Sequence, residues 1–199
     1  NNPELSQAKI LQSAQTLFIE RGFAGTSMSA IAKDSGVTQS MIHHYFGSKE
    51  ELWQAVKKEA YDEYLAHQQQ LLDLDNTDIE SFIESSLCSR FTFFQENPQT
   101  ARLLSWLQIM EDPTGMETGQ EIGRQLLAKI RQAQAAGQIR DDVAPESVLA
   151  MSIALTTYWF QSRHYTENLT GIAPADRETA DAAYLEGIMK VFVAGLKAK

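Results

Sequence analysis

Residues 26–46 read TSMSAIAKDSGVTQSMIHHYF, two short helical patterns separated by a turn. Thr26 or Ser27 is a suitable N-cap for the first helix, and Thr38 for the second. The turn contains Gly36, which tolerates a tight backbone conformation. Small and apolar residues, needed where two helices cross, occur at the crossing points: Ala32, Ile31, Val37 and Ile42. This pattern predicts a helix-turn-helix.

The second of these helices presents polar side chains outward. Gln39, Ser40, His43 and His44 are all able to hydrogen-bond base edges or phosphates in a major groove. Helix-turn-helix geometry also occurs in proteins that bind no DNA, so the pattern alone leaves both interpretations open. The two adjacent histidines do not predict a metal site, because neighbouring helical positions point about 100° apart.

Helical periodicity continues over the rest of the chain. Ile10, Ala14, Leu17 and Phe18 form one apolar stripe of a helix expected to stop at Gly22. Gly47 is expected to end the second helix of the motif, and Ser48 to Glu51 form a capping box for the next. Nine helices are expected in an all-α chain, the later ones over about 49–74, 81–95, 99–110, 117–136, 145–168 and from 174 onward. The capping box assigned to Thr77–Glu80 precedes the helix over 81–95. We expect a DNA-binding domain over 1–48 and a ligand-binding and dimerisation domain over 49–199.

Composition limits the class of protein. The chain has 199 residues and a formal net charge of −9, with 43% hydrophobic residues, typical of a globular fold. Its apolar runs are too short for a membrane span, and no secretory leader is expected at its start. The single cysteine, Cys88, excludes an intramolecular disulfide and favours a cytoplasmic location.

The negative charge at first argues against a nucleic-acid partner, since a basic surface is the usual footprint. Its distribution changes this interpretation. Residues 1–60 carry six basic and six acidic side chains, whereas residues 61–199 carry eleven basic and twenty acidic ones. The acidity therefore lies in the region that is not expected to touch DNA.

Two stretches carry a resemblance to a known family. Residues 14–37, AQTLFIERGFAGTSMSAIAKDSGV, and residues 42–52, IHHYFGSKEEL, strongly resemble the TetR family of bacterial repressors. The resemblance implies a homodimer that binds a palindromic operator and that needs no cofactor. By position it implies base contacts by Gln39, Ser40 and His43. It also implies phosphate contacts by Ser27, Thr38, His44, Tyr45 and Lys49. Many members have Tyr where this chain has His43 and His44.

The C-terminal half is rich in large apolar side chains, which either pack an ordinary core or line a cavity for a small, largely apolar effector. The residues expected to line such a cavity are His67, Phe94, Trp106, Met110, Met151 and Tyr158. The last two helices carry more apolar residues than one packed face requires, which favours a dimer interface. That face is expected to include Tyr184, Ile188, Val191, Phe192 and Gly195; burial within one monomer is the alternative.

Other classes of protein fit less well. The chain has no Gly-rich phosphate loop, no cluster of Cys and His ligands and no nucleophile elbow, so neither an enzyme nor a metal site is expected. A helical adaptor that keeps the helix-turn-helix only as a fold, and a regulator that needs a corepressor, remain as alternatives.

Overall fold

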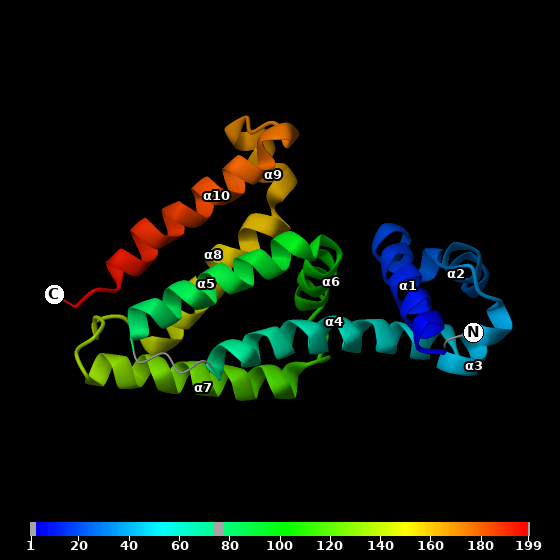
Figure 1. Cartoon of the computed structure of the whole chain (residues 1–199), viewed down its shortest axis with the longest axis horizontal. Helices are drawn as coiled ribbons and strands as arrows, with labels where there is room; N and C mark the ends of the chain where they lie inside the picture. The colour runs from blue at the N-terminus through cyan, green and yellow to red at the C-terminus, as the bar shows by residue number, and fades with distance from the viewer. Residues whose placement is uncertain (1–2, 74–77, 199) are drawn as a thin grey trace. The chain divides into compact units, whose positions relative to one another are not determined.

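The computed structural model describes residues 3–73 and 78–198. Within these residues the chain is all-α, as predicted, with one isolated antiparallel bridge between Ile139 and Lys197 and no strand. The α-helices are α1 (Pro3–Gly25), α2 (Met28–Ser35), α3 (Gln39–Phe46), α4 (Lys49–Leu72), α5 (Ile79–Glu96), α6 (Pro98–Ile109), α7 (Met116–Ala135), α8 (Pro145–Gln161), α9 (Arg163–Thr170) and α10 (Arg177–Ile188) (Figure 1). Across the described ranges, no helix is long and apolar enough to cross a membrane.

The contacts divide the chain into two compact units. The N-terminal unit contains the residues up to Glu63 together with Arg102–Gly115, and the C-terminal unit contains Tyr64–Ala101 and Met116 onward. Helix α4 therefore contributes its first part to one unit and its last part to the other, and so does α6. The domain boundary at residue 48 stays a prediction.

An ion pair joins residues 102–115 to the first part of α4 within the N-terminal unit. Lys57 on α4 is buried, and its Nζ lies 2.7 Å from Oδ2 of Asp112 in the loop after α6. Burial by itself raises the pKa of the Asp112 carboxyl. The hydrogen bonds from Lys57 and Thr114 together have the larger, opposite effect, so the pKa lies below its usual value. The ionised pair thus fastens this loop to α4.

The core of the N-terminal unit contains the predicted stripe of α1. Leu17 and Phe18 are buried, and so is Thr26, whose Oγ1 donates to the carbonyls of Leu17 at 3.0 Å and Gly22 at 2.9 Å. Gly22 has φ +71°, a left-handed conformation that glycine adopts without strain. The helical hydrogen bonding resumes beyond this break to Gly25, so the predicted stop at Gly22 is a kink inside α1.

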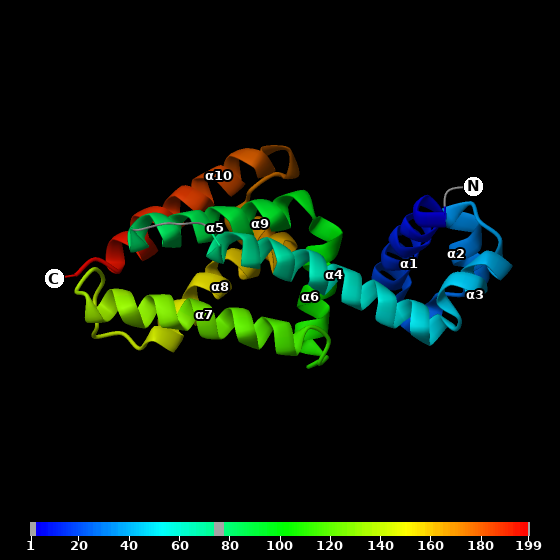
Figure 2. The same ribbon diagram turned by 60° about the horizontal axis from the view of Figure 1, so that its bottom comes forward.

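The C-terminal unit packs α5 along α8 and α8 against α7 (Figure 2). Phe91 of α5 is buried at its centre, with its ring 4.7 Å from that of Phe160 on α8. The sequence predicted one helix over 145–168, which was wrong. Ser162 interrupts it with φ −101° and ψ 13°. The carbonyl of Tyr158 accepts there from both the backbone N–H of Ser162 at 2.9 Å and its Oγ at 2.6 Å, a side-chain bond of the kind that bends helices.

Two further predicted helix starts differ in detail. The chain from 174 forms a short 3₁₀ turn, Pro174–Asp176, before α10 begins, and a π-helical segment, Met189–Val193, follows α10. The predicted capping box before α5 included Thr77, which lies outside the described residues. Asp78 is the N-cap there, accepting from the backbone N–H groups of Glu80 at 3.3 Å and Ser81 at 3.0 Å.

Candidate nucleic-acid interface

The helix-turn-helix forms as the sequence predicted. The Ser27 Oγ accepts from the backbone N–H of Ala30 at 3.1 Å and caps α2, and Thr38 caps α3 in the same way. Gly36 adopts the left-handed conformation in the turn, with φ +71°. Ile31 and Ile42 are completely buried, so they wedge α2 and α3 together.

The outward face of α3 contains the residues expected to contact bases. Gln39, Ser40 and His43 are exposed, and Gln39 lies one helical turn before His43, with 3.4 Å between their Nε2 atoms. His43 Nδ1 lies 2.7 Å from the carbonyl oxygen of Gly47. Because a carbonyl only accepts, Nδ1 carries the proton, and Nε2 of the neutral ring is an acceptor. The face thus combines an amide with a ring acceptor.

The residues expected to contact phosphates lie at the N-caps of α2 and α3, on α3 itself and at the start of α4. Ser27, Thr38 and His44 are exposed and Tyr45 is half-buried, its ring 5.4 Å from that of His44. The hydroxyls of Ser27 and Thr38 already accept from backbone N–H groups as caps. Each hydroxyl can still donate its own hydrogen to a phosphate oxygen.

Lys49 has a structural role that sequence reasoning missed. Its Nζ donates to the carbonyls of Phe23 at 3.0 Å and Thr26 at 3.1 Å, and it lies 4.3 Å from the centre of the Phe23 ring. An ammonium has three N–H donors, so one remains for a phosphate. The carbonyls that it binds lie 23 and 26 residues earlier in the chain, a separation that no local sequence pattern reveals.

The predicted capping box at the start of α4 is confirmed. The backbone N–H of Ser48 donates to Oε2 of Glu51 at 2.7 Å, and the backbone N–H of Glu51 donates to Ser48 Oγ at 3.1 Å. The bonds from the Ser48 backbone and hydroxyl lower the pKa of the Glu51 carboxyl. This box fixes the first turn of α4, where Lys49 lies.

The residues expected to line an effector cavity are not all brought together. His67 and Phe94 are near neighbours in the C-terminal unit, both in contact with the ring of Phe93. Trp106 and Met110 belong to the N-terminal unit instead, and both are exposed. Met151 and Tyr158 are exposed on α8.

The residues expected at a dimer interface also divide into two sets. Tyr184 stacks on Trp159 with 4.0 Å between ring centres and donates its hydroxyl to the carbonyl of Leu155 at 2.8 Å. Ile188 is buried within the monomer. Phe192 is half-buried, whereas Gly195 is exposed and Val191 is 77% exposed.

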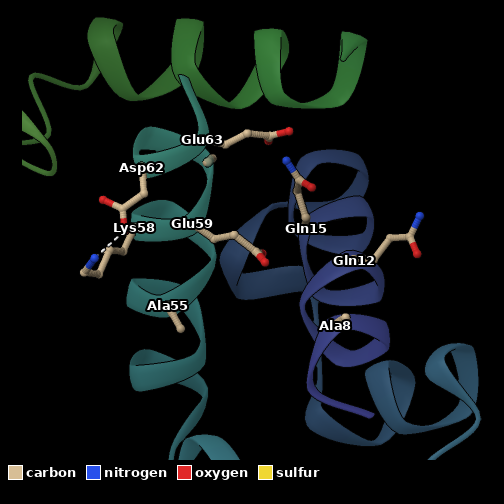
Figure 3. Close-up of a pocket in the computed structure, with 9 residues that line it drawn as sticks. Ala8, Gln12, Gln15, Ala55, Lys58, Glu59, Asp62 and Glu63 are labelled. Carbon is tan, nitrogen blue, oxygen red and sulfur yellow. Dashed lines mark hydrogen bonds and ion pairs between the residues drawn. The ribbon is translucent and has the colours of Figure 1, made fainter. Parts of the chain in front are cut away.

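A cleft of about 650 Å³ lies in the N-terminal unit between α1 and α4 (Figure 3). Gln12 and Gln15 face Glu59 and Glu63 across it, and none of the six residues expected to contact the effector lines it. Burial and then the nearby charge of Glu63 raise the pKa of Glu59. The cleft is acidic, so it suits neither DNA phosphates nor an apolar effector.

A group of buried polar side chains in the C-terminal unit was not predicted. Arg90 on α5 donates from Nη2 to Oε1 of Gln68 on α4 at 3.2 Å, and from Nη1 to the carbonyl of Ser152 on α8 at 3.2 Å. Gln68, Ser86 and Arg90 are all buried. The helical spacing of Ser86 and Arg90 is visible in the sequence, but their burial is not.

No candidate metal site is found in the two described ranges, because no three His, Cys, Asp or Glu side chains gather closely enough to hold a metal ion.

Known proteins resemble both parts of the chain. Residues 10–56 match the family described as bacterial regulatory proteins, tetR family, and residues 88–186 match the tetracyclin repressor-like C-terminal domain. The transcriptional repressor SCO4008 of Streptomyces coelicolor is 27% identical over 79% of this chain and 79% of its own length. The transcriptional repressor NicS of Pseudomonas putida is 25% identical over 94% of this chain and 91% of its own.

Solved structures share the fold. The ketosteroid transcriptional regulator KstR2 of Mycobacterium tuberculosis superposes with a TM-score of 0.76 at 16% identity, covering 97% of this chain and 95% of the other. GusR of Salmonella enterica gives 0.65 at 23% identity, covering 98% and 97%. The relatives found by sequence are named as transcriptional regulators, not enzymes. With both its helix-turn-helix and its C-terminal domain matched, the chain belongs to the TetR family and is a ligand-responsive, DNA-binding transcriptional regulator.

Proposed function

We propose that the protein is a cytoplasmic repressor that binds a palindromic operator as a homodimer and leaves it when a small molecule binds the C-terminal unit. The observation that carries the proposal is the division of α3 into two faces. Ile42 is completely buried against α2, while Gln39 and His43 are exposed one turn apart. A buried anchor beside an exposed polar pair is the arrangement of a recognition helix in a major groove.

The charge of the N-terminal unit supports base recognition as the main source of affinity. Because residues 1–60 are neutral overall, non-specific attraction to phosphates is weak. Two copies of the helix, one from each protomer, then supply the specific contacts. Half-sites about one helical turn apart, ~34–36 Å, match such a dimer.

The dimer face that we propose adds exposed apolar side chains of α8 to those of the segment after α10, and so gives Met151 and Tyr158 a role other than the effector contact expected from the sequence. Met151 and Tyr158 lie seven residues apart on α8 and are 41% and 56% exposed, and Val191 is more exposed still. Residues seven apart share one side of a helix. Exposed apolar groups on two elements favour association of two copies. Tyr184 packs on Trp159 and Ile188 is buried, so both belong to the core of the monomer in this proposal.

Release follows from the two-unit arrangement. Helix α4 contributes Lys49–Glu63 to the N-terminal unit and Tyr64–Leu72 to the C-terminal unit. An effector that prefers one conformation of the C-terminal part of α4 changes the population of DNA-binding conformations by its differential affinity.

The proposal is tested by selecting bound fragments from a random DNA library and measuring their affinity by fluorescence anisotropy. We expect a palindromic site, a dimeric mass by light scattering, and a loss of about 5- to 100-fold in affinity for Gln39→Ala and for His43→Ala. Gln12→Ala, an exposed glutamine on α1, is the matched control and should bind as the wild type does. Wild-type affinity in both α3 variants would refute the proposed recognition helix.

A further inference from the structure

Arg90 is a buried cation with no counter-charge among the described residues. Its side chain is on α5 and is only 2% exposed. Its two hydrogen bonds go to neutral oxygens, Oε1 of Gln68 and the backbone carbonyl of Ser152, both at 3.2 Å. No carboxylate of the described residues forms an ion pair with it. A guanidinium has five N–H donors, so three remain.

The unpaired polar atoms beside it are all able to donate. Three buried side-chain atoms have no hydrogen-bond partner among the described residues: Nε of Arg90, Nε2 of Gln68 and Oγ of Ser86. Ser86 precedes Arg90 by four residues, so both lie on the same face of α5. Gln68 reaches Arg90 from α4. Donors therefore outnumber acceptors in the cluster, whose side-chain acceptors are Oε1 of Gln68 and the Ser86 hydroxyl.

Such a cluster is unfavourable unless a further acceptor is present. Burying a charge or an unpaired polar group away from water is costly, and buried polar groups are almost always hydrogen-bonded. A well-packed apolar side chain in the place of a buried charge is commonly neutral or stabilising. An anion with planar, paired oxygens fits this cluster, because the fork of a guanidinium matches a carboxylate in a bidentate manner.

Aromatic side chains flank the cluster one helical turn away. On α4, Tyr64 lies four residues before Gln68, and on α5, Phe94 lies four residues after Arg90. The rings of Tyr64 and Phe94 stack with 5.4 Å between their centres and 16° between their planes. Because α4 and α5 are antiparallel, the Gln68–Arg90 pair and the Tyr64–Phe94 pair lie one helical turn apart along the two helices. A ligand whose carboxylate binds Arg90 would therefore place its apolar part beside the rings of Tyr64 and Phe94.

We propose that the effector is a carboxylate with an apolar or aromatic body, held by Arg90, Gln68 and Ser86. This inference rests on the proposed function, since it names the class of the effector in the C-terminal unit. The opposite interpretation is that Arg90 only fastens α4, α5 and α8 together. The two interpretations differ in what removal of the charge does to the ligand-free protein.

The first experiment measures the melting temperature of the ligand-free protein. In Gln68→Leu/Arg90→Met both partners of the hydrogen bond become apolar, so neither is left unpaired. We expect the melting temperature of this variant to equal or exceed that of the wild type. A fall of more than about 2 °C, a change larger than a near-neutral replacement produces in a chain of this size, would show that Arg90 is a structural fastener and would overturn the proposal.

The second experiment adds probes to the free protein at constant ionic strength. Benzoate, indole-3-acetate and octanoate are each compared with their uncharged primary amides. We expect at least one carboxylate to raise the wild-type melting temperature by about 4 °C more than its amide at saturation. The rise should vanish in Arg90→Met and persist in Arg124→Met, which removes an exposed guanidinium on α7.

Equal responses to every carboxylate and its amide, or a response that survives in Arg90→Met, would overturn the proposal. Binding of the wild type to the selected operator is measured separately. A wild type that binds no operator refutes the proposed function, whereas the carboxylate response of the free protein tests Arg90 by itself.

Discussion

Replacing Lys49 by Met separates the two roles that the structure gives this residue. The Met side chain keeps most of the apolar stem beside the Phe23 ring but removes the ammonium. The carbonyls of Phe23 and Thr26 then lose the donor that lies 3.0 Å and 3.1 Å away. Any phosphate contact of the third N–H is lost as well.

The expected effect on stability follows from these two bonds. A hydrogen bond to a charged group contributes about 1.5–3 kcal/mol, and water around the half-buried Lys49 replaces part of it. We therefore expect a loss of about 2 kcal/mol in the free energy of unfolding. For a chain of 199 residues this lowers the melting temperature by about 4–8 °C.

The expected effect on DNA binding is a change in salt dependence. Each phosphate contact contributes about −0.9 to the slope of log K against log salt. With one Lys49 in each protomer of a dimer, Lys49→Met should make the slope shallower by about 1.8. Because the contact is to a phosphate, the affinity should fall by a similar factor for every DNA sequence.

Thermal melts and anisotropy titrations at several salt concentrations measure the two effects independently. Lys58→Met is the matched control, because it removes the same charge from the same helix, where an exposed ammonium pairs with Asp62. An unchanged slope beside a lowered melting temperature would leave Lys49 with a structural role only. An unchanged melting temperature would refute the part played by the two carbonyl bonds.

Three further predictions concern the cores and the charges of the two units. Ile42→Ala leaves a cavity under α3 and should lower the free energy of unfolding by about 2–5 kcal/mol, measured by urea denaturation. Asp181→Asn should lower it by about 3 kcal/mol, because the buried carboxylate that accepts from Arg163 at 2.9 Å loses its charge and its new amide N–H donors face those of Trp159 and Gln95. Glu59→Gln should raise the melting temperature at neutral pH, because burial and Glu63 raise the pKa of Glu59 and so oppose its ionised form. A carboxyl with a raised pKa binds its proton more tightly in the folded state, so this gain should vanish as the pH falls through that pKa.

Matched substitutions control these predictions. Ile109→Ala removes an equal side chain that is 78% exposed, and it should change stability by no more than about 0.5 kcal/mol. Glu186→Gln breaks an exposed pair with Lys190 and should leave the melting temperature unchanged. If Ile109→Ala or Glu186→Gln changed stability as much as the corresponding buried substitution, burial would not explain the predicted changes in stability. A stabilising effect of Glu59→Gln that persisted in acid would contradict the assigned titration.

The sequence by itself determined the local structure of the N-terminal unit. The caps at Ser27 and Thr38, the turn at Gly36 and the buried pair Ile31 and Ile42 are all set by residues within about twenty positions of each other. Caps, turns and helical stripes depend on near neighbours in the chain, so a pattern of residue types predicts them. The exposed face of α3 follows from the same periodicity.

Only the tertiary structure decided the sites that depend on distant residues. Lys49 bonds to carbonyls 23 and 26 residues away in the chain. Tyr184 looks equally suited to a dimer interface and to a core until its ring is found on Trp159. Arg90 resembles any other helical arginine until its burial between α4, α5 and α8 is known. Periodicity tells which side of a helix is apolar, but not which helix covers that side, and burial and pairing are set by packing between helices.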